Sequence, residues 1–299
     1  MVKVNGKYGY INRSGKIVVK PQFDIAFDFS EELAFVSGNS GQGVINKQGL
    51  FVIKQKFDVV GDFIDGLARV SIKGDWVYID RTGKIVIRPD VDSAEEFSQG
   101  LARVLRKDKY GFIDRSGQMV IAPGFDEAWD FSEGLAPVIV DNKGGYIDKN
   151  GQFVIPPQFE GVGRFREGLA IFSVGEKFGF IDKSGKIIID PQYDWVNSFS
   201  EGLAAVNIGR MMEGQWFYIG KDGKKAIDSQ FEWAGDFSEG LAPVEVNGKY
   251  GFIDKLGKFV IEPKFDGAWG FEDGLANVWV NEKRGYIDKL GKFVWQPSE

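Results

Sequence analysis

The sequence contains no cysteine and no histidine. Without cysteine there is neither a disulfide nor a thiolate that could act as nucleophile or metal ligand. Without histidine, the usual general base near neutral pH and the commonest metal ligand are both missing. We therefore expect a protein that is not an enzyme and that holds no cofactor and no metal.

Long apolar runs and blocks of positive charge are also absent. No stretch approaches the roughly eighteen apolar residues of a membrane span, and residues 1–7 lack the basic and apolar segments of a signal peptide. A net charge of −6 and a pI near 5.1 argue against nucleic acid or an anionic membrane as a partner. A soluble, cytoplasmic protein is expected.

What the chain does contain is a repeat of 34 residues. Its marker glycines are spaced by 34 residues, apart from one step of 38, and they are Gly15, Gly49, Gly83, Gly117, Gly151, Gly185, Gly223, Gly257 and Gly291. A fixed period of this length is typical of stacked arrays. Because no change in composition divides the chain, we expect residues 1–299 to form one continuous array of nine repeats.

Each copy begins as a hairpin. Residues 241–246 alternate in polarity and contain β-branched side chains, which indicates a first strand. Asn247 and Gly248 both tolerate positive φ, so they predict a two-residue turn into a second strand at 250–254.

The second turn has Asp254 first and Gly257 fourth, which fits a type I turn with a G1 bulge. A third strand follows at 258–261. Proline comes next in seven of nine copies and is expected to end the pairing. A connecting segment, residues 265–271 in this copy, then crosses to the next repeat. No helical period is visible, so the fold class is all-β.

The third strands are apolar on both faces, as in residues 85–87 and 187–189. Such strands need sheets above and below them, so the meanders must stack face to face. Nine meanders stand against eight connecting segments, and neither end of the chain supplies the missing one. This count favours an open, superhelical, solenoid-like stack of antiparallel β-meanders over the alternative, a closed β-propeller of eight or nine blades.

The repeat resembles the bacterial WG-repeat family over essentially the whole chain. The match rests on Tyr/Phe-Gly-Phe/Tyr-Ile-Asp-x-x-Gly-Lys and on Phe-Asp-x-Ala-x-x-Phe-Ser-Glu-Gly-Leu-Ala. The family's Trp-Gly pair is represented here by pairs such as Tyr110-Gly111, while Trp76-Val77 and Trp216-Phe217 keep Trp and lose Gly. The resemblance implies an interaction scaffold and brings no substrate or catalytic residue with it.

One carboxylate recurs in every connecting segment. The eight are Asp24, Asp58, Asp92, Asp126, Glu160, Asp194, Glu232 and Asp266. They could form a ladder of metal or substrate ligands, or accept hydrogen bonds from backbone N–H groups. Eight identical copies suit eight identical structural needs, so the structural interpretation is favoured.

The turns alternate in charge. In each of the nine copies, a basic residue follows the last residue of the second strand. An acidic residue precedes the glycine position in seven of the eight turns that end the connecting segments, as in Glu31 and Glu239. Both kinds of turn should lie at one edge of the stack. Solubility and weak registration between repeats are the favoured interpretation, and a ring of acids for a cationic partner is the alternative.

Two columns inside the connecting segment vary freely. The first holds Ile25, Val59, Ser93, Glu127, Gly161, Trp195, Trp233 and Gly267; the second holds Phe27, Gly61, Glu95, Trp129, Gly163, Asn197, Gly235 and Trp269. A strict period of two places both on the face of the flanking Phe residues, which favours packing. Aromatic residues on a repeat surface are also typical of recognition, and both interpretations stay open.

The repeat of 38 residues lengthens one hairpin at 207–216, where Met211 and Met212 could form a soft contact. The candidate partner-binding residues are therefore Trp129, Trp195, Trp233, Trp269, Met211 and Met212. The favoured function is a scaffold that binds another protein. The alternatives are a lectin-like glycan binder that uses the tryptophans and, more remotely, a carboxylate-based hydrolase.

Overall fold

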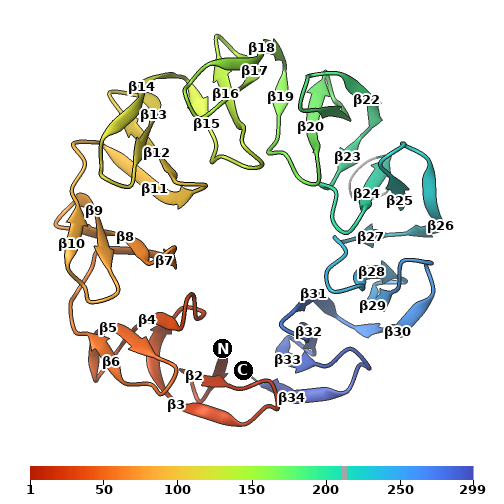
Figure 1. The fold of residues 1–299 in the computed structure, drawn as a ribbon. Helices are drawn as coiled ribbons and strands as arrows, with labels where there is room; N and C mark the ends of the chain where they lie inside the picture. Colours follow the sequence, from red (N-terminus) through yellow and green to blue (C-terminus); the bar gives the residue numbers. More distant parts are fainter. Residues whose placement is uncertain (210–213, 299) are drawn as a thin grey trace. The chain divides into compact units, whose positions relative to one another are not determined.

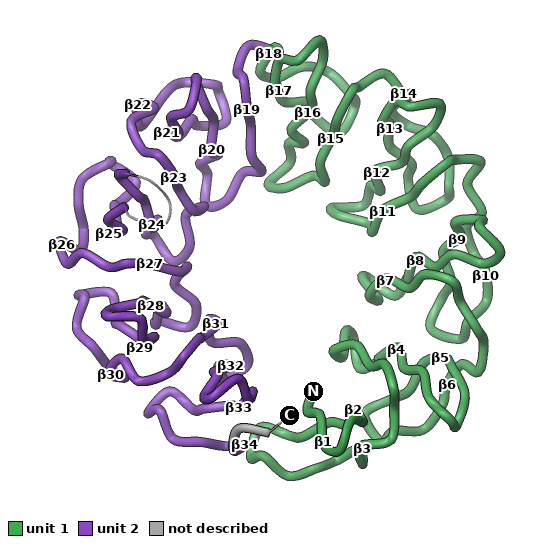
Figure 2. Tube along the Cα trace, turned by 180° about the vertical axis from the view of Figure 1, so that it is seen from behind, with its two compact units in different colours: residues 1–157 green, residues 158–299 purple. Residues whose placement is uncertain are grey.

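The computed structural model describes residues 1–209 and 214–298, and the regular elements in those ranges are β-strands. No helix able to cross a membrane occurs in this part of the chain. The chain divides into two compact units, residues 1–157 and 158–299, which are described separately (Figure 2). The all-β fold class is therefore confirmed.

Unit 1 contains four sheets, the last of which ends in a strand that reaches residue 159. The first sheet has the order β1 (Val2–Val4), β2 (Lys7–Ile11), β3 (Ile17–Ala26), β4 (Leu33–Gly38), β5 (Gly41–Asn46), β6 (Phe51–Ile53). The second has β7 (Val59–Ile64), β8 (Leu67–Ile72), β9 (Asp75–Asp80), β10 (Ile85–Ile87). The third has β11 (Ser93–Ser98), β12 (Leu101–Arg106), β13 (Lys109–Asp114), β14 (Met119–Phe125), and the fourth β15 (Glu127–Ala128), β16 (Ala136–Val140), β17 (Lys143–Ile147), β18 (Phe153–Phe159).

Unit 2 also contains four sheets. They are β19 (Gly161–Val162), β20 (Leu169–Val174), β21 (Lys177–Asp182), β22 (Ile187–Tyr193); then β23 (Trp195–Val196), β24 (Leu203–Ile208), β25 (Gln215–Gly220), β26 (Lys225–Phe231). The last two are β27 (Trp233–Ala234), β28 (Ala242–Val246), β29 (Lys249–Ile253), β30 (Phe259–Phe265); then β31 (Gly267–Glu272), β32 (Leu275–Val280), β33 (Lys283–Ile287), β34 (Phe293–Ser298).

The predicted three-stranded meander is present, and the connecting segment adds a fourth strand to it. In the third sheet β11 pairs with β12 through Ala94↔Val104 and Phe97↔Ala102. The connecting segment thus contributes the first strand of the next sheet, with a register shift between Ala94 and Phe97 in this copy, and is not a free crossover.

Proline does not end the sheet, contrary to our expectation. Pro123 lies inside β14, and Phe125 beyond it still pairs with Tyr110. The pairing is possible because β14 is an edge strand with a bulge opposite Gly111, so the missing N–H removes no ladder hydrogen bond.

Successive sheets within a unit pack face to face, as expected. The third strands of the meanders are nevertheless not buried on both faces, contrary to our expectation, because strands such as β10 and β22 are edge strands: Val86 is 43% exposed and Ile187 is 45% exposed. One cluster in unit 1 joins Tyr78 and Ile87 of the second sheet to Phe97 and Val104 of the third. In each unit the sheets follow an arc with the first strands on its concave side (Figure 1). The arrangement is that of propeller blades, which was the alternative, and not of solenoid layers.

The predicted turns are confirmed. Asn247 and Gly248 have φ of 51° and 67°, the type I′ signature. In the Asp-x-x-Gly turns the glycine N–H donates back to the aspartate carbonyl, at 2.9 Å between Gly83 N and Asp80 O, and Gly83 has a φ of 85°. The aspartate carboxylate also accepts from the Thr82 N–H at 2.8 Å. These contacts are local, which is why the sequence predicts them well.

The recurring carboxylates serve the backbone, as the structural interpretation predicts. Asp126 Oδ2 accepts from the N–H of Asp141 at 2.8 Å, and Glu232 accepts from the N–H groups of Asn247 and Gly248 at 2.9 Å each. They cap the hairpin between the second and third strands of their own sheet. Asp126 also pairs with Lys109.

Polar side chains also link neighbouring sheets. Ser98 Oγ donates to the carbonyl of Phe131 in the next sheet at 2.7 Å. Glu31 Oε2 accepts from the N–H of Gly66 at 2.8 Å and from Arg81 at 2.6 Å. The alternating turn charges therefore link one sheet to the next, which confirms the registration that we expected of them.

Candidate functional site

A groove of 630 Å³ lies across the inner strands of three consecutive sheets of unit 2. Trp233 in β27 and Trp269 in β31 line it, and Asn197, which follows β23, adds an amide. These strands lie on the concave side of the unit (Figure 1). All three residues belong to the freely varying columns of the repeat.

The Trp233 ring is held across a glycine. A Cβ on Gly235 would lie 2.8 Å from Cη2 of Trp233 and 2.9 Å from Cγ of Pro243, so the ring and the proline occupy the space above this residue. The Tyr250 ring centroid lies 5.7 Å from that of Trp233. Gly235 also offers its carbonyl to Tyr218 Oη at 2.7 Å, which fixes the strand beneath the ring.

Trp269 stands out from the strand. Its exposed fraction is 61%, and its ring meets Trp279 edge to face at 6.3 Å between centroids. Trp279 packs in turn over Gly267, where a Cβ would lie 3.4 Å from Cε3. One indole therefore orients another whose surface faces solvent.

Carboxylates accompany the indoles. Asn197 Nδ2 donates to Asp236 Oδ1 at 2.9 Å. Partial removal of water by the groove walls raises the pKa of Asp236, although the side chain still reaches solvent; the Asn197 hydrogen bond and the charge of Arg166 oppose the rise.

Two glutamates complete the acidic lining. Glu239 pairs with Lys289 at 3.1 Å and accepts from the Gly274 N–H at 3.1 Å, and these bonds hold its pKa below the usual range. Glu272 is exposed. The site thus combines aromatic faces with hydrogen-bond acceptors and negative charge. No three acidic side chains come together as a metal site in the ranges that the structure describes.

Comparison with protein families identifies the repeat. A model described as "WG containing repeat" matches residues 8–39, 43–76, 76–110, 110–143, 145–178, 178–210, 216–250 and 250–283. These segments cover most of the chain. The chain belongs to the WG-repeat family.

The glycine of the WG-repeat pair has a steric reason. A Cβ on Gly111 would lie 2.6 Å from the carbonyl oxygen of Ile121 and 2.8 Å from the nitrogen of Pro123. The outer strand bulges over Gly111 and leaves no room for a side chain there. In the second sheet Val77 replaces this glycine although Pro89 follows, and there the outer strand β10 ends at Ile87, before the proline. Where Phe217 replaces the glycine, Ser229 replaces the proline.

Comparison with solved structures finds matches to this WG-repeat protein at low sequence identity. Hsv2p of Kluyveromyces lactis is 10% identical, with a TM-score of 0.46 over 77% of this chain and 93% of that one. The dihydro-heme d1 dehydrogenase NirN is 13% identical, with a TM-score of 0.49 over 85% and 70%. PorZ of Porphyromonas gingivalis is 10% identical, with a TM-score of 0.35 over 94% and 47%. These scores carry no argument about function, and no curated protein matches the sequence.

The structure brings two of the predicted site residues together in this groove, Trp233 and Trp269. Trp195 is 44% exposed in β23 of the same unit, beside Phe178 and outside the groove lining. Trp129 is half-buried in unit 1. Met211 and Met212 lie outside the described residues.

The variable columns do not share a face with the flanking Phe residues, contrary to the strict period of two. In β31 a register shift falls between Ala268 and Phe271, so both of these are buried while Trp269 points the other way. The bulge inserts one residue and reverses the alternation. The sequence did not reveal it.

Sequence reasoning also missed Asp236. It belongs to the column just before the closing Phe, which holds Asp28, Asp62, Glu96, Asp130, Arg164, Ser198, Asp236 and Gly270. Acids occupy five of these eight positions while the others differ. The frequent acids and the variation between copies were the signal in the sequence that this column faces solvent.

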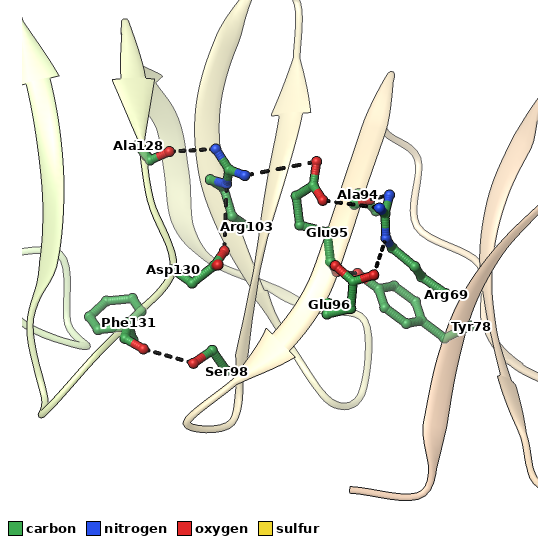
Figure 3. A network of polar contacts seen from close by, with 10 residues as sticks. All are labelled: Arg69, Tyr78, Ala94, Glu95, Glu96, Ser98, Arg103, Ala128, Asp130 and Phe131. Atoms are coloured by element: carbon green, nitrogen blue, oxygen red, sulfur yellow. Dashed lines mark hydrogen bonds and ion pairs between the residues drawn. The ribbon is translucent and has the colours of Figure 1, made fainter. Parts of the chain in front are cut away.

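Unit 1 carries a charged network at the corresponding place (Figure 3). Arg69 Nε binds Glu96 at 2.7 Å, and its Nη1 donates to the carbonyl of Ala94 in the next sheet at 3.0 Å. Arg103 repeats the pattern, donating to the Ala128 carbonyl at 2.5 Å, with Asp130 at 3.7 Å. These two arginines link neighbouring sheets of unit 1 through hydrogen bonds, at the place that corresponds to the groove in unit 2.

Proposed function

We propose that this WG-repeat protein is a non-enzymatic binding scaffold that holds a segment of another protein in the groove of unit 2. The observation that carries the proposal is the position of Trp233 and Trp269. Both come from columns without a shared packing role, and both line one 630 Å³ groove. Binding sites commonly have volumes of about 300–1,000 Å³ and a mainly apolar lining.

The constant and the variable residues of the repeat have different roles, and this difference supports the proposed function. The constant residues cap hairpins and link sheets, as Asp126 and Ser98 do. Trp269, at 61% exposed, makes no comparable contribution to the core. Large exposed aromatic side chains around a concave surface are typical anchors of protein recognition.

The test compares matched variants in affinity capture followed by quantitative mass spectrometry. A partner enriched on the wild-type protein should be lost with Trp269→Ala and retained with Trp195→Ala, an exposed Trp outside the groove lining. Both variants should keep the wild-type melting temperature. Equal capture by all three proteins would refute the groove as the binding surface.

A glycan is the second candidate ligand, because an indole face beside an amide–carboxylate pair suits a sugar ring and its hydroxyls. Trp269 supplies the face, and Asn197 with Asp236 supplies the polar pair. An array of neutral oligosaccharides tests it: specific signals should disappear with Trp269→Ala and persist with Trp195→Ala. An array without such signals rejects it.

The proposal includes a cytoplasmic location and, because the chain is acidic, neither nucleic acid nor a membrane as partner. Cell fractionation with protease protection tests the location. Recovery of the protein outside the cytoplasmic fraction would contradict it.

A further inference from the structure

The sign of the charge in the unit 2 groove points to a particular ligand class. Among the described residues that line it, Asp236, Glu239 and Glu272 carry carboxylates, and none carries a positive charge. Lys289 is not among the lining residues, and its Nζ is bound to both Oε2 and the main-chain oxygen of Glu239, at 3.1 and 2.9 Å. Glu239 is therefore neutralised within the protein.

Asp236 and Glu272 are the two carboxylates left for a ligand. Asp236 accepts one hydrogen bond from Asn197 at 2.9 Å, and a carboxylate has room for several more. Arg166 is the cation whose field reaches Asp236. Glu272 is the last residue of β31, is exposed, and lines the groove from the sheet next to the one that contributes Asp236.

The indoles attract the same sign of charge as the carboxylates. The face of Trp carries negative electrostatic potential and binds ammonium or guanidinium groups, at a gain of about 0.5–2 kcal/mol depending on how much water is excluded. Trp269 presents an exposed ring, and Trp233 lines the groove above Gly235. An aliphatic stem that ends in a cation would satisfy the ring and the carboxylate together.

We infer that the groove between β27 and β31 recognises a lysine or arginine side chain on an extended segment of the partner protein. This inference rests on the proposed scaffold function and names the chemistry of the segment. The cation lies between Asp236 and Glu272, and its methylene stem lies against Trp269.

The experiment uses the full chain and defined peptides in isothermal titration calorimetry. The probe is an acetylated and amidated tri-lysine peptide; its norleucine and glutamate counterparts keep the length and remove or reverse the charge. The tri-lysine peptide should bind, and the two counterparts should bind at least about tenfold more weakly. Affinity should fall as salt is raised, because charges at an open groove are screened.

Variants then locate the site. Trp269→Ala, Asp236→Asn and Glu272→Gln should each weaken tri-lysine binding several-fold, while Trp195→Ala and Glu262→Gln should leave it unchanged. Glu262 is an exposed acid on β30 outside the groove lining, so it controls for loss of general charge. Glu272 is exposed as well, so its variant tests the site even if Asp236→Asn lowers stability.

Two results would overturn the inference. One is equal binding of the tri-lysine and norleucine peptides, and the other is a tri-lysine affinity that none of the three groove variants changes. Binding of a neutral oligosaccharide in place of the peptide, lost with Trp269→Ala, would also reject the cation and favour the glycan. If the tri-lysine peptide does not bind but capture of a partner protein still depends on Trp269, the preference for a cationic side chain is rejected and the proposed scaffold function is retained.

Discussion

At the scale of single residues, the repeat uses glycine for two different purposes. Gly83 adopts a φ of 85°, which a G1 bulge requires. Gly111 instead makes room for the backbone of the outer strand. A repeated glycine in the sequence therefore does not by itself say which of the two constraints applies.

Substituting Gly111 tests the steric explanation. Gly111→Ala should lower the free energy of unfolding by about 1–3 kcal/mol, as expected for overpacking, because its Cβ would meet Ile121 O at 2.6 Å. Gly124→Ala in the same sheet is the control, since its nearest neighbour would be 3.9 Å away. Urea denaturation measures both. Equal effects of the two substitutions would refute the close-approach argument.

At the scale of elements, the turns are stabilised by their own carboxylates. The pKa values of Asp80 and Asp114 lie below the ordinary value of 3.8 for aspartate. The main cause is the hydrogen bond that each carboxylate accepts from a hydroxyl group, that of Thr82 or Ser116. A lowered folded pKa means that the stabilisation is complete above pH 3.8 and is lost as the pH falls through the folded value. These turns should therefore weaken in acid.

A double variant, Asp80→Asn with Asp114→Asn, separates the hydrogen bonds from the charge. The protein already contains the comparison: Asn12 Oδ1 accepts from the N–H groups of Ser14 and Lys16 at 3.0 and 2.9 Å. The double variant should melt at a lower temperature than wild type at pH 7, because the amides lack the charge-assisted part of these bonds, and its melting temperature should fall less than that of wild type between pH 5 and pH 3. Differential scanning calorimetry across this range measures both. An unchanged acid sensitivity would show that the two carboxylates do not control it.

At the scale of the whole molecule, each sheet is stabilised by its neighbours along the chain. Phe112 in the third sheet packs against Phe131, 5.0 Å between ring centroids, which belongs to the fourth. Clusters of this kind join consecutive sheets within each unit. Stability in such arrays is approximately a sum of local and nearest-neighbour contributions.

Removing one of these contacts should affect neighbours first. Phe112→Ala should cost about 3–5 kcal/mol, since the ring is fully buried and leaves a cavity. Hydrogen exchange should rise most in β11–β18 and least in β31–β34. Leu256→Ala, at an 89% exposed position, should change stability by less than about 0.5 kcal/mol. A uniform rise in exchange across all sheets would contradict the nearest-neighbour description.

The candidate site could be predicted only in part. Comparing the copies of the repeat singled out Trp233 and Trp269 as free of a shared packing role, and both line the groove. It also singled out Trp195 and Trp129, which lie elsewhere, and it missed Asp236. The copies show which positions vary, but not which ones meet across three consecutive sheets.

The sequence alone determined the meanders, the turn types and the role of the constant carboxylates, because these depend on residues within one repeat. Tertiary structure decided the rest. The bulge in β31 sets which face Trp269 occupies, and face-to-face packing arranges the successive sheets of each unit along an arc (Figure 1). The packing of the sheets depends on contacts between repeats, such as Ser98 to Phe131, which are 33 residues apart. A pattern that repeats identically in every copy cannot specify what one place in the array binds.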